Sequence, residues 1–262
     1  MPYDTLRYDV EGAVATIALD QPETRNALSD QVLDELLAAF AAARADAAVR
    51  CVVLTSTHET VFSSGGDLAG FSGDVPLIEK HFATAGRFPA LFRTIGELGK
   101  PTLCAANGHV LAGALGLALA CDLIVAIEEA AFGLPEVKRG LVAGAGGLYR
   151  LPRALPKALA LELIMTGAHF PAKRALEHGL VNRLVKRDQL MPEALKLAAE
   201  ICENAPLAVR ASLSVAKQAY DLDDAGLREL SGEVSRKNAQ TEDYKEGPRA
   251  FIEKRAPRWA GR

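Results

Sequence analysis

The chain has 262 residues, 49% of them hydrophobic, which is enough to bury a substantial core without a disulfide or a metal to stabilise it. Its 30 basic and 33 acidic residues give a formal charge of −3, and the basic residues are dispersed, which argues against a nucleic-acid-binding patch. The four cysteines form no C-x-x-C pair and lie near no histidine pair at zinc-ligand spacing, so we expect reduced thiols and no metal centre.

The sequence favours a cytoplasmic protein without a membrane span. Residues 1–9 carry charges and no apolar segment, which argues against a secretory signal. Residues 101–121 contain no Lys, Arg, Asp or Glu and are long enough to cross a bilayer. However, Asn107, Gly108 and His109 interrupt this segment with turn residues, so it is better explained as two buried elements.

The first half of the chain alternates between strand and helix patterns. Residues 6–19 alternate around Glu11-Gly12, which is typical of a β-hairpin. Ser29 is a suitable N-cap for a helix with one apolar face. Alternating strands and helices predict an α/β fold. The further elements expected in this half are a strand at 51–55, a helix at 77–98, a strand at 102–106, a helix at 112–120 and a strand at 123–126.

The last third of the chain is predicted to be mostly helical. After Gly147 the strand signal nearly stops, and no Pro- or Ser-rich linker sets off an independent domain. We divide the chain into a core, residues 1–200, and a helical C-terminal region, residues 201–262. The helices expected after Gly147 cover 157–165, 172–178, 191–204, 207–220 and 224–237.

Two glycine-containing segments each follow a predicted strand and precede helical sequence. They read S-S-G-G-D-L at 63–68 and N-G-H-V-L-A-G-A at 107–114. Free N–H groups at such positions can bind a developing negative charge, and two of them can form an oxyanion hole. Each such donor contributes about 3 kcal/mol to a transition state. Gly66 and Gly113 would let a substrate oxygen approach the backbone, although glycines of turns and helix caps more often have no catalytic role.

Together with F-G-L-P-E at 132–136, these segments resemble the crotonase (enoyl-CoA hydratase/isomerase) superfamily in order and in spacing. The likeness covers most of the chain, and the combination of motifs is far more specific than any one of them. The other matching stretches are D-Q-P at 20–22, R-N-A-L at 25–28, C-D-L-I at 121–124, G-A-G-G at 144–147, A-L-E-H-G-L-V at 175–181 and E-G-P-R-A-F-I-E-K-R at 246–255.

The resemblance implies a spiral of ββα units in the core, which would bind an acyl-CoA or enoyl-CoA thioester. Coenzyme A would come with the substrate, so no separate cofactor is expected. The helical C-terminal region would cover the CoA and form a homotrimer, or a dimer of trimers. The oxyanion donors would be Gly66 and Gly113. The residues implied to flank the CoA are Ala27, Leu28, Asp67 and Leu68, with Arg25 as a phosphate contact and Phe251 and Lys254 reaching the CoA of a neighbouring subunit.

The family's principal acid/base glutamate falls on Glu136, although a glutamate after a proline is by itself more often a solvated turn residue. Hydratases carry a second glutamate at the position of Gly116, and certain hydrolytic and dienoyl-isomerising relatives carry an aspartate at the position of Gly144. A single glutamate can move one proton between two carbons, which favours double-bond isomerisation through an enolate. Because glycine is a poor helix residue, we also expect the backbone at position 116 to accept glutamate, provided that the helix near Ala112 tolerates the larger side chain.

Two alternatives remain open. The chain could be a 2-enoyl-CoA hydratase, a lyase of fatty-acid oxidation, in which one glutamate or a water replaces the missing acid. It could also be a non-catalytic acyl-CoA-binding homologue, although a carboxylate is costly to bury in an apolar pocket that performs no chemistry. His81 and His109 are further acid/base candidates, since imidazole titrates near neutrality, but surface or structural roles are more common for such residues.

Overall fold

The structure is a computed structural model that describes residues 3–67 and 77–262, without the side chains of 77–85. The chain begins with the expected hairpin, in which β1 (Leu6–Glu11) pairs antiparallel with β2 (Val14–Leu19). Gly12 has a positive φ of 58° in its turn. The expected N-cap is also present, because the Ser29 hydroxyl accepts from the N–H of Val32, 3.3 Å away, at the start of α1 (Asp30–Ala45).

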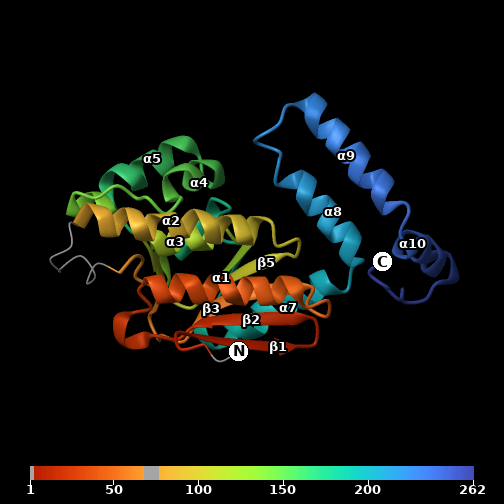
Figure 1. Cartoon of the computed structure of the whole chain (residues 1–262), viewed down its shortest axis with the longest axis horizontal. Coiled ribbons are helices and arrows are strands. Elements are labelled where there is room, and N and C mark those ends of the chain that lie inside the picture. Colours follow the sequence, from red (N-terminus) through yellow and green to blue (C-terminus); the bar gives the residue numbers. More distant parts are fainter. Residues whose placement is uncertain (1–2, 68–76) are drawn as a thin grey trace.

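A six-stranded sheet forms the larger layer of the core (Figure 1). Its order is β1-β2-β3-β5-β7-β10, and every pairing after the hairpin is parallel. Strands β3 and β5 are buried at every position, as expected for parallel strands that are covered on both faces. The strands that follow the hairpin are β3 (Cys51–Ser56), β5 (Thr102–Ala106), β7 (Leu123–Ile127) and β10 (Arg183–Val185).

A smaller, four-stranded sheet has the order β4-β6-β8-β9, and its first three strands are parallel. These strands are β4 (Val61–Ser63), β6 (His109–Leu111), β8 (Ala131–Gly133) and β9 (Phe170–Pro171). Successive strands alternate between the sheets, so β3-β4, β5-β6 and β7-β8 each contribute one strand to each layer. Each pair is followed by a helix, respectively α2 (Leu77–Gly96), α3 (Gly113–Ala118) and α4 (Gly147–Ala154). The chain therefore winds as repeated ββα units.

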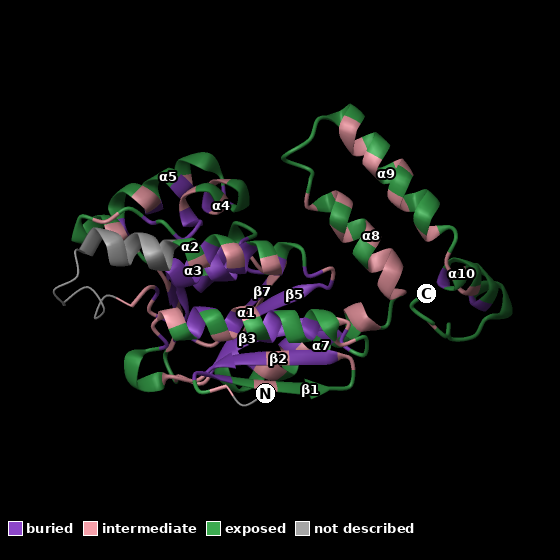
Figure 2. Cartoon of the chain, in the orientation of Figure 1, coloured by how far each residue is buried: buried purple, intermediate pink, exposed green. Residues whose placement is uncertain are grey.

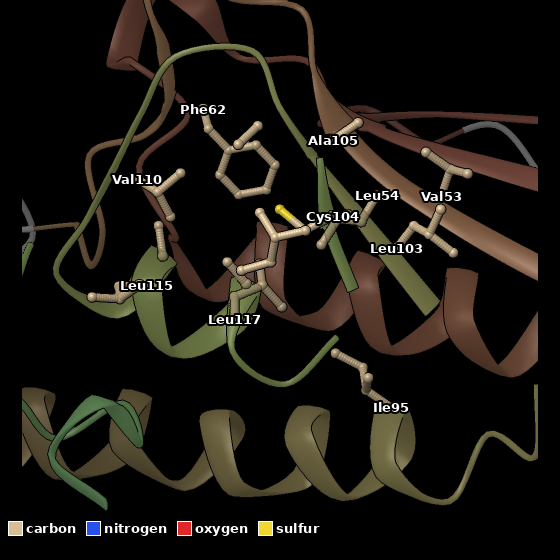
Figure 3. Close-up of a cluster of buried hydrophobic side chains, with 14 of the residues drawn as sticks. Val53, Leu54, Phe62, Ile95, Leu103, Cys104, Ala105, Val110, Leu115 and Leu117 are labelled. Carbon is tan, nitrogen blue, oxygen red and sulfur yellow. The ribbon is translucent and has the colours of Figure 1, made fainter. Parts of the chain in front are cut away.

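The core lies between these layers (Figure 3). Phe62 and Val110 of the smaller sheet, Leu54 and Cys104 of the larger sheet, and Leu117 of α3 are all fully or almost fully buried. No helix in the described part of the chain combines the length and apolar character needed to cross a bilayer.

Helices dominate after α4. They are α5 (Lys157–Thr166), α6 (Ala172–Glu177), α7 (Leu190–Cys202), α8 (Pro206–Ala216), α9 (Asp224–Asn238) and α10 (Glu242–Glu253). Helix α7 packs against β2, β3, β5 and β7. The last three helices form an arm, residues 206–262, that extends away from the core (Figure 1). Helices α8 and α9 contain no buried residue, so the arm has little core of its own (Figure 2). An ion pair of 2.7 Å between Lys217 and Asp122 joins the arm to the core.

Candidate active site

Three predicted segments meet at one edge of the smaller sheet. Strands β4, β6 and β8 are parallel neighbours, so the residues after each strand lie side by side. Residues 64–66 follow β4, residues 112–113 follow β6, and residues 134–136 follow β8. The carboxyl ends of parallel strands are where ligands bind in α/β sheets. The sheet order thus gathers Gly66, Gly113 and Glu136.

A cavity of about 410 Å³ opens at this edge, which is within the range of small-molecule sites. Its lining includes all three predicted catalytic residues, Gly66, Gly113 and Glu136. Three of the residues implied to contact CoA also line it: Arg25, Ala27 and Asp67. The remaining lining residues are Thr24, Ser64, Phe88, Leu111, Ala112, Pro135, Arg139, Leu141, Val142, Gly144 and Ala145.

The two expected N–H donors lie on turns that touch each other. Gly65 has a φ of 93°, and a Cβ at this position would lie 2.5 Å from the Cβ of Ala112 and 3.0 Å from the nitrogen of Gly113. Only glycine permits this approach. Gly113 is the first residue of α3, so its N–H has no acceptor within the helix. Within the described residues, neither Gly66 nor Gly113 donates its N–H to a backbone carbonyl. Both donors are therefore available to a ligand.

Backbone strain is concentrated next to one donor. Ala112 has φ 52° and ψ −128°, a combination that is nearly confined to glycine. Such a residue costs about 1–3 kcal/mol and persists only when its surroundings hold it in place. Here the Ala112 N–H donates to the carbonyl of Gly133 over 2.9 Å, which ties the turn to the end of β8. The strained turn fixes where Gly113 begins its helix.

A buried asparagine holds the loop that carries Arg25 and Ala27. Asn26 is only 1% exposed, and its side chain accepts from the N–H of Gln21 at 2.7 Å. Its amide donates to the Ser56 hydroxyl at 2.7 Å and to the Phe62 carbonyl at 3.3 Å. Sequence reasoning missed this role of Asn26. The available signal was its residue type, since asparagine tolerates the positive φ of 51° found here better than most residues.

Leu28, Phe251 and Lys254, which are also implied CoA contacts, do not line the cavity of their own chain. Leu28 is fully buried, and its N–H donates to the Gly65 carbonyl over 2.8 Å, which fastens the loop beside Gly66. Leu68 lies outside the described residues, as does the side chain of His81. Phe251 and Lys254 lie at the end of α10 in the arm, where Phe251 is 85% exposed.

His109 belongs to β6 and does not line the cavity. Its Nδ1 is buried and has no hydrogen-bond partner within the described residues. Its ring lies 6.1 Å from that of His169, centroid to centroid, and burial lowers the pKa of His109. This arrangement does not bring the imidazole to the two donors.

Glu136 carries a carboxylate that is partly removed from water at the cavity. It lies in a short 3-10 helix, Pro135–Arg139, and its Oε2 is buried without a hydrogen-bond partner among the described residues. Burial raises the pKa of Glu136, while its own backbone N–H and the positive charge of Arg139 act in the opposite direction. A desolvated carboxylate in a cleft is a candidate general base.

Gly116 and Gly144, the two positions where relatives carry other acids, differ sharply in the space that they leave for a side chain. A Cβ at Gly116 would lie 1.7 Å from the carbonyl oxygen of Ala145, so no side chain fits there. The condition that the helix tolerates a larger side chain at position 116 is therefore not met, because helix propensity takes no account of a neighbouring loop. A Cβ at Gly144 would meet nothing nearer than the Val142 carbonyl at 4.0 Å. Of the described lining residues, only Asp67 and Glu136 are acidic.

Within residues 3–67 and 77–262 we find no grouping of three or more His, Cys, Asp or Glu side chains that could hold a metal ion. The cavity offers the chemistry of its own side chains and backbone. Two N–H donors, one perturbed carboxylate and an apolar lining are suited to polarising a carbonyl and moving a proton beside it.

The chain is similar to known proteins over nearly its whole length. Residues 9–262 match the family model described as enoyl-CoA hydratase/isomerase. A carnitinyl-CoA dehydratase of Salmonella typhi is 38% identical, with 99% of each chain covered. A solved enoyl-CoA hydratase of Bacillus anthracis superposes with a TM-score of 0.95 at 32% identity, covering 99% of this chain and all of the other. An enoyl-CoA hydratase of Mycobacterium tuberculosis gives a TM-score of 0.87 at 36% identity, covering 98% of this chain and 99% of the other.

The predicted α/β spiral is thus the crotonase fold, present over nearly the whole chain. The family assignment made from the motifs is confirmed, and so is the assignment as an enzyme of hydratase/isomerase type. This chain is a member of the enoyl-CoA hydratase/isomerase, or crotonase, family, which acts on CoA thioesters.

Proposed function

We propose that the enzyme shifts the double bond of an enoyl-CoA thioester, with Glu136 as the only proton carrier. The observation that carries this proposal is the buried Oε2 of Glu136, which has no partner among the described residues, in a cavity that also contains the N–H groups of Gly66 and Gly113. A carboxylate with one desolvated, unpartnered oxygen is costly to bury, and a pure carrier has no evident need for it. This argues against a non-catalytic acyl-CoA carrier.

In the proposed reaction, the thioester carbonyl oxygen accepts hydrogen bonds from the N–H groups of Gly66 and Gly113. Glu136 removes a proton from the carbon next to the carbonyl of a 3-enoyl-CoA. The electron pair moves toward the carbonyl, and the enolate oxygen is stabilised by the two donors. The double bond moves next to the carbonyl when Glu136 returns the proton to the γ carbon. No atom is gained or lost, and no cofactor beyond the CoA of the substrate is required.

Hydration of a 2-enoyl-CoA, or the reverse dehydration, is the second candidate, since the similar proteins are named hydratase and dehydratase. It requires one group to activate water and one to protonate the α carbon. The close packing of Gly116 against Ala145 excludes an acid at the position where hydratases carry their second glutamate. This is why isomerisation is favoured here. Asp67 is the described acid that could assist Glu136 in hydration.

The arm has a proposed role in assembly. Its large exposed apolar side chains include Tyr220, Leu222, Phe251 and Ile252, and its helices α8 and α9 bury no residue within one chain. We keep the expectation that the arm forms a trimer, or a dimer of trimers, in which Phe251 and Lys254 reach the CoA of a neighbouring subunit.

The four cysteines are free thiols, which agrees with the expected cytoplasmic location.

A substrate panel tests the proposed reaction. The protein is incubated with 2-enoyl-CoA and 3-enoyl-CoA thioesters of several acyl lengths, and the products are followed by ultraviolet absorbance and mass. We expect 3-enoyl esters to become conjugated without a change in mass. Gain of one water by 2-enoyl esters, without isomerisation of any 3-enoyl ester, would favour the hydratase instead. Tight binding without turnover on the whole panel would favour the carrier.

A further inference from the structure

The 3-10 helix that carries Glu136 also brings a cation to the cavity. Such a helix has about three residues per turn, so side chains three positions apart project on the same side. Glu136 and Arg139 have this spacing, and both line the cavity. The two residues between them lie elsewhere. A Cβ at Gly167, after the end of α5, would be 3.1 Å from Val137 Cγ2 and 3.2 Å from Lys138 Cε.

Arg139 has little to bind within the chain. Among the described residues, its one hydrogen bond runs from Nη1 to the Pro135 carbonyl of the same turn, at a long 3.4 Å. Among the described residues, no carboxylate forms an ion pair with it. Its charge is felt by Glu136 through space. A guanidinium presents a planar fork of N–H donors that matches a carboxylate, and most of this fork is unused.

The order of the strands separates Arg139 from the other cation at the cavity. Arg25 is tied to the end of β4, because the N–H of Ser64 donates to its carbonyl over 3.0 Å. Gly113 follows β6, and Arg139 follows β8. Because β6 lies between β4 and β8, one donor of the thioester oxygen lies between the loop of Arg25 and the turn of Arg139. A thioester with its CoA toward Arg25 would direct its acyl group toward Arg139.

The cavity that the exposed Arg139 lines also has several apolar residues. Leu141, Val142, Phe88 and Ala145 border the same cavity, and none of them can satisfy a guanidinium. A purely hydrocarbon acyl chain would displace water from Arg139 without replacing its hydrogen bonds, which is unfavourable. A carboxylate at the end of a short acyl chain would replace them with a charge-assisted pair.

We propose that Arg139 binds a carboxylate at the far end of the acyl group, so that the preferred ligands are CoA thioesters of short dicarboxylic acids. This inference rests on the proposed function for the direction in which the acyl group lies. Pairing of Arg139 with the ligand also adds a negative charge near Glu136, which makes that carboxylate a stronger base. An acyl group that ends in a quaternary ammonium is repelled by Arg139.

Binding of saturated thioesters tests the inference without any turnover. Calorimetry compares glutaryl-CoA with valeryl-CoA, which have acyl groups of equal carbon number that end in a carboxylate and a methyl group. We expect the wild type to bind glutaryl-CoA about tenfold more tightly or better, the scale of a charge-assisted hydrogen bond. Arg139→Met should remove this preference and leave the affinity for valeryl-CoA nearly unchanged. The control is Lys138→Met, which removes a neighbouring cation that does not line the cavity and should keep the preference.

Several outcomes would overturn the inference: equal affinities in the wild type, a preference that survives Arg139→Met, equal weakening of both esters in that variant, or no binding of either ester. Arg139→Gln serves as a second variant if circular dichroism shows that the methionine variant is not folded. The two proposals fail separately. A glutaryl preference without turnover of any enoyl-CoA would contradict only the isomerase. Turnover of neutral enoyl-CoA without a glutaryl preference would contradict only the role of Arg139.

Discussion

The two walls of the cavity are shaped by different forces. One wall, residues 63–66 and 111–116, carries the N–H donors, and at Gly65 and Gly116 it leaves no room for a side chain because neighbouring backbone lies too close. The other wall, residues 134–145, carries Glu136 and Arg139 and leaves open space at Gly144. In the donor wall the unfavourable feature is the backbone conformation of Ala112. In the acid wall it is the carboxylate of Glu136, which is removed from water. We infer that the donor wall fixes the thioester and that the acid wall determines reaction and specificity.

Alanine substitutions at one glycine of each wall are the most severe test of this difference between the two walls. Gly116→Ala places a methyl group against the Ala145 carbonyl and should destabilise the protein by about 1–3 kcal/mol or more, since neither backbone can move freely. Activity should fall with it because Gly113 is on the same helix. Gly144→Ala meets open space and should keep the wild-type melting temperature. Equal melting temperatures for the two variants would show that the donor wall is not tightly packed.

The buried carboxylate of Glu136 predicts that the difference in stability between the wild type and Glu136→Gln depends on pH. The pKa of Glu136 is raised in the folded state, so its contribution to stability is fully present below the usual glutamate range and is lost as the pH rises through the raised pKa. Glu136→Gln cannot titrate. It should therefore melt at a higher temperature than the wild type at neutral pH, and the difference should shrink in acid. Glu177→Gln, an exposed carboxylate on α6, is the control and should show no such trend.

The smallest expected effect concerns the strained backbone of the donor wall. Ala112→Gly replaces an alanine in a conformation that suits glycine, so relief of strain should raise stability by up to about 1 kcal/mol. The turn keeps its bond from the residue 112 N–H to Gly133, so turnover should remain close to wild type. Thermal melts and steady-state rates measure both quantities. A clear loss of stability would mean that the methyl group contributes more by packing than its conformation costs.

The sequence predicted the elements whose signals are long or local. The hairpin, the Ser29 cap and the buried strands of the larger sheet were all predicted, since each shows a clear pattern over several residues. Strands β4, β6 and β8 have only three residues each, too few for a period to be seen, so the second sheet was not predicted. Helix α4 was also missed, since Pro152 within it signals a break.

Much of the candidate site was within reach of the motifs. Gly66, Gly113 and Glu136 were named from spacing and resemblance, and the structure brings them to one cavity. Arg139 was missed because its place depends on the local 3-10 geometry of Pro135–Arg139, which no pattern reveals. The lack of room for a side chain at position 116 was missed because it results from a contact with Ala145, in a segment far away in the sequence.

The central claim is that Glu136 moves the proton beside a carbonyl held by the donor wall. The most direct measurement is exchange of the α protons of a saturated acyl-CoA in heavy water, followed by nuclear magnetic resonance, because it needs neither a double bond nor product release. We expect the wild type to exchange these protons. The rate for Glu136→Gln should be lower by about a hundredfold or more, with CoA-ester affinity nearly unchanged. Exchange by a folded Glu136→Gln variant at the wild-type rate would contradict the account.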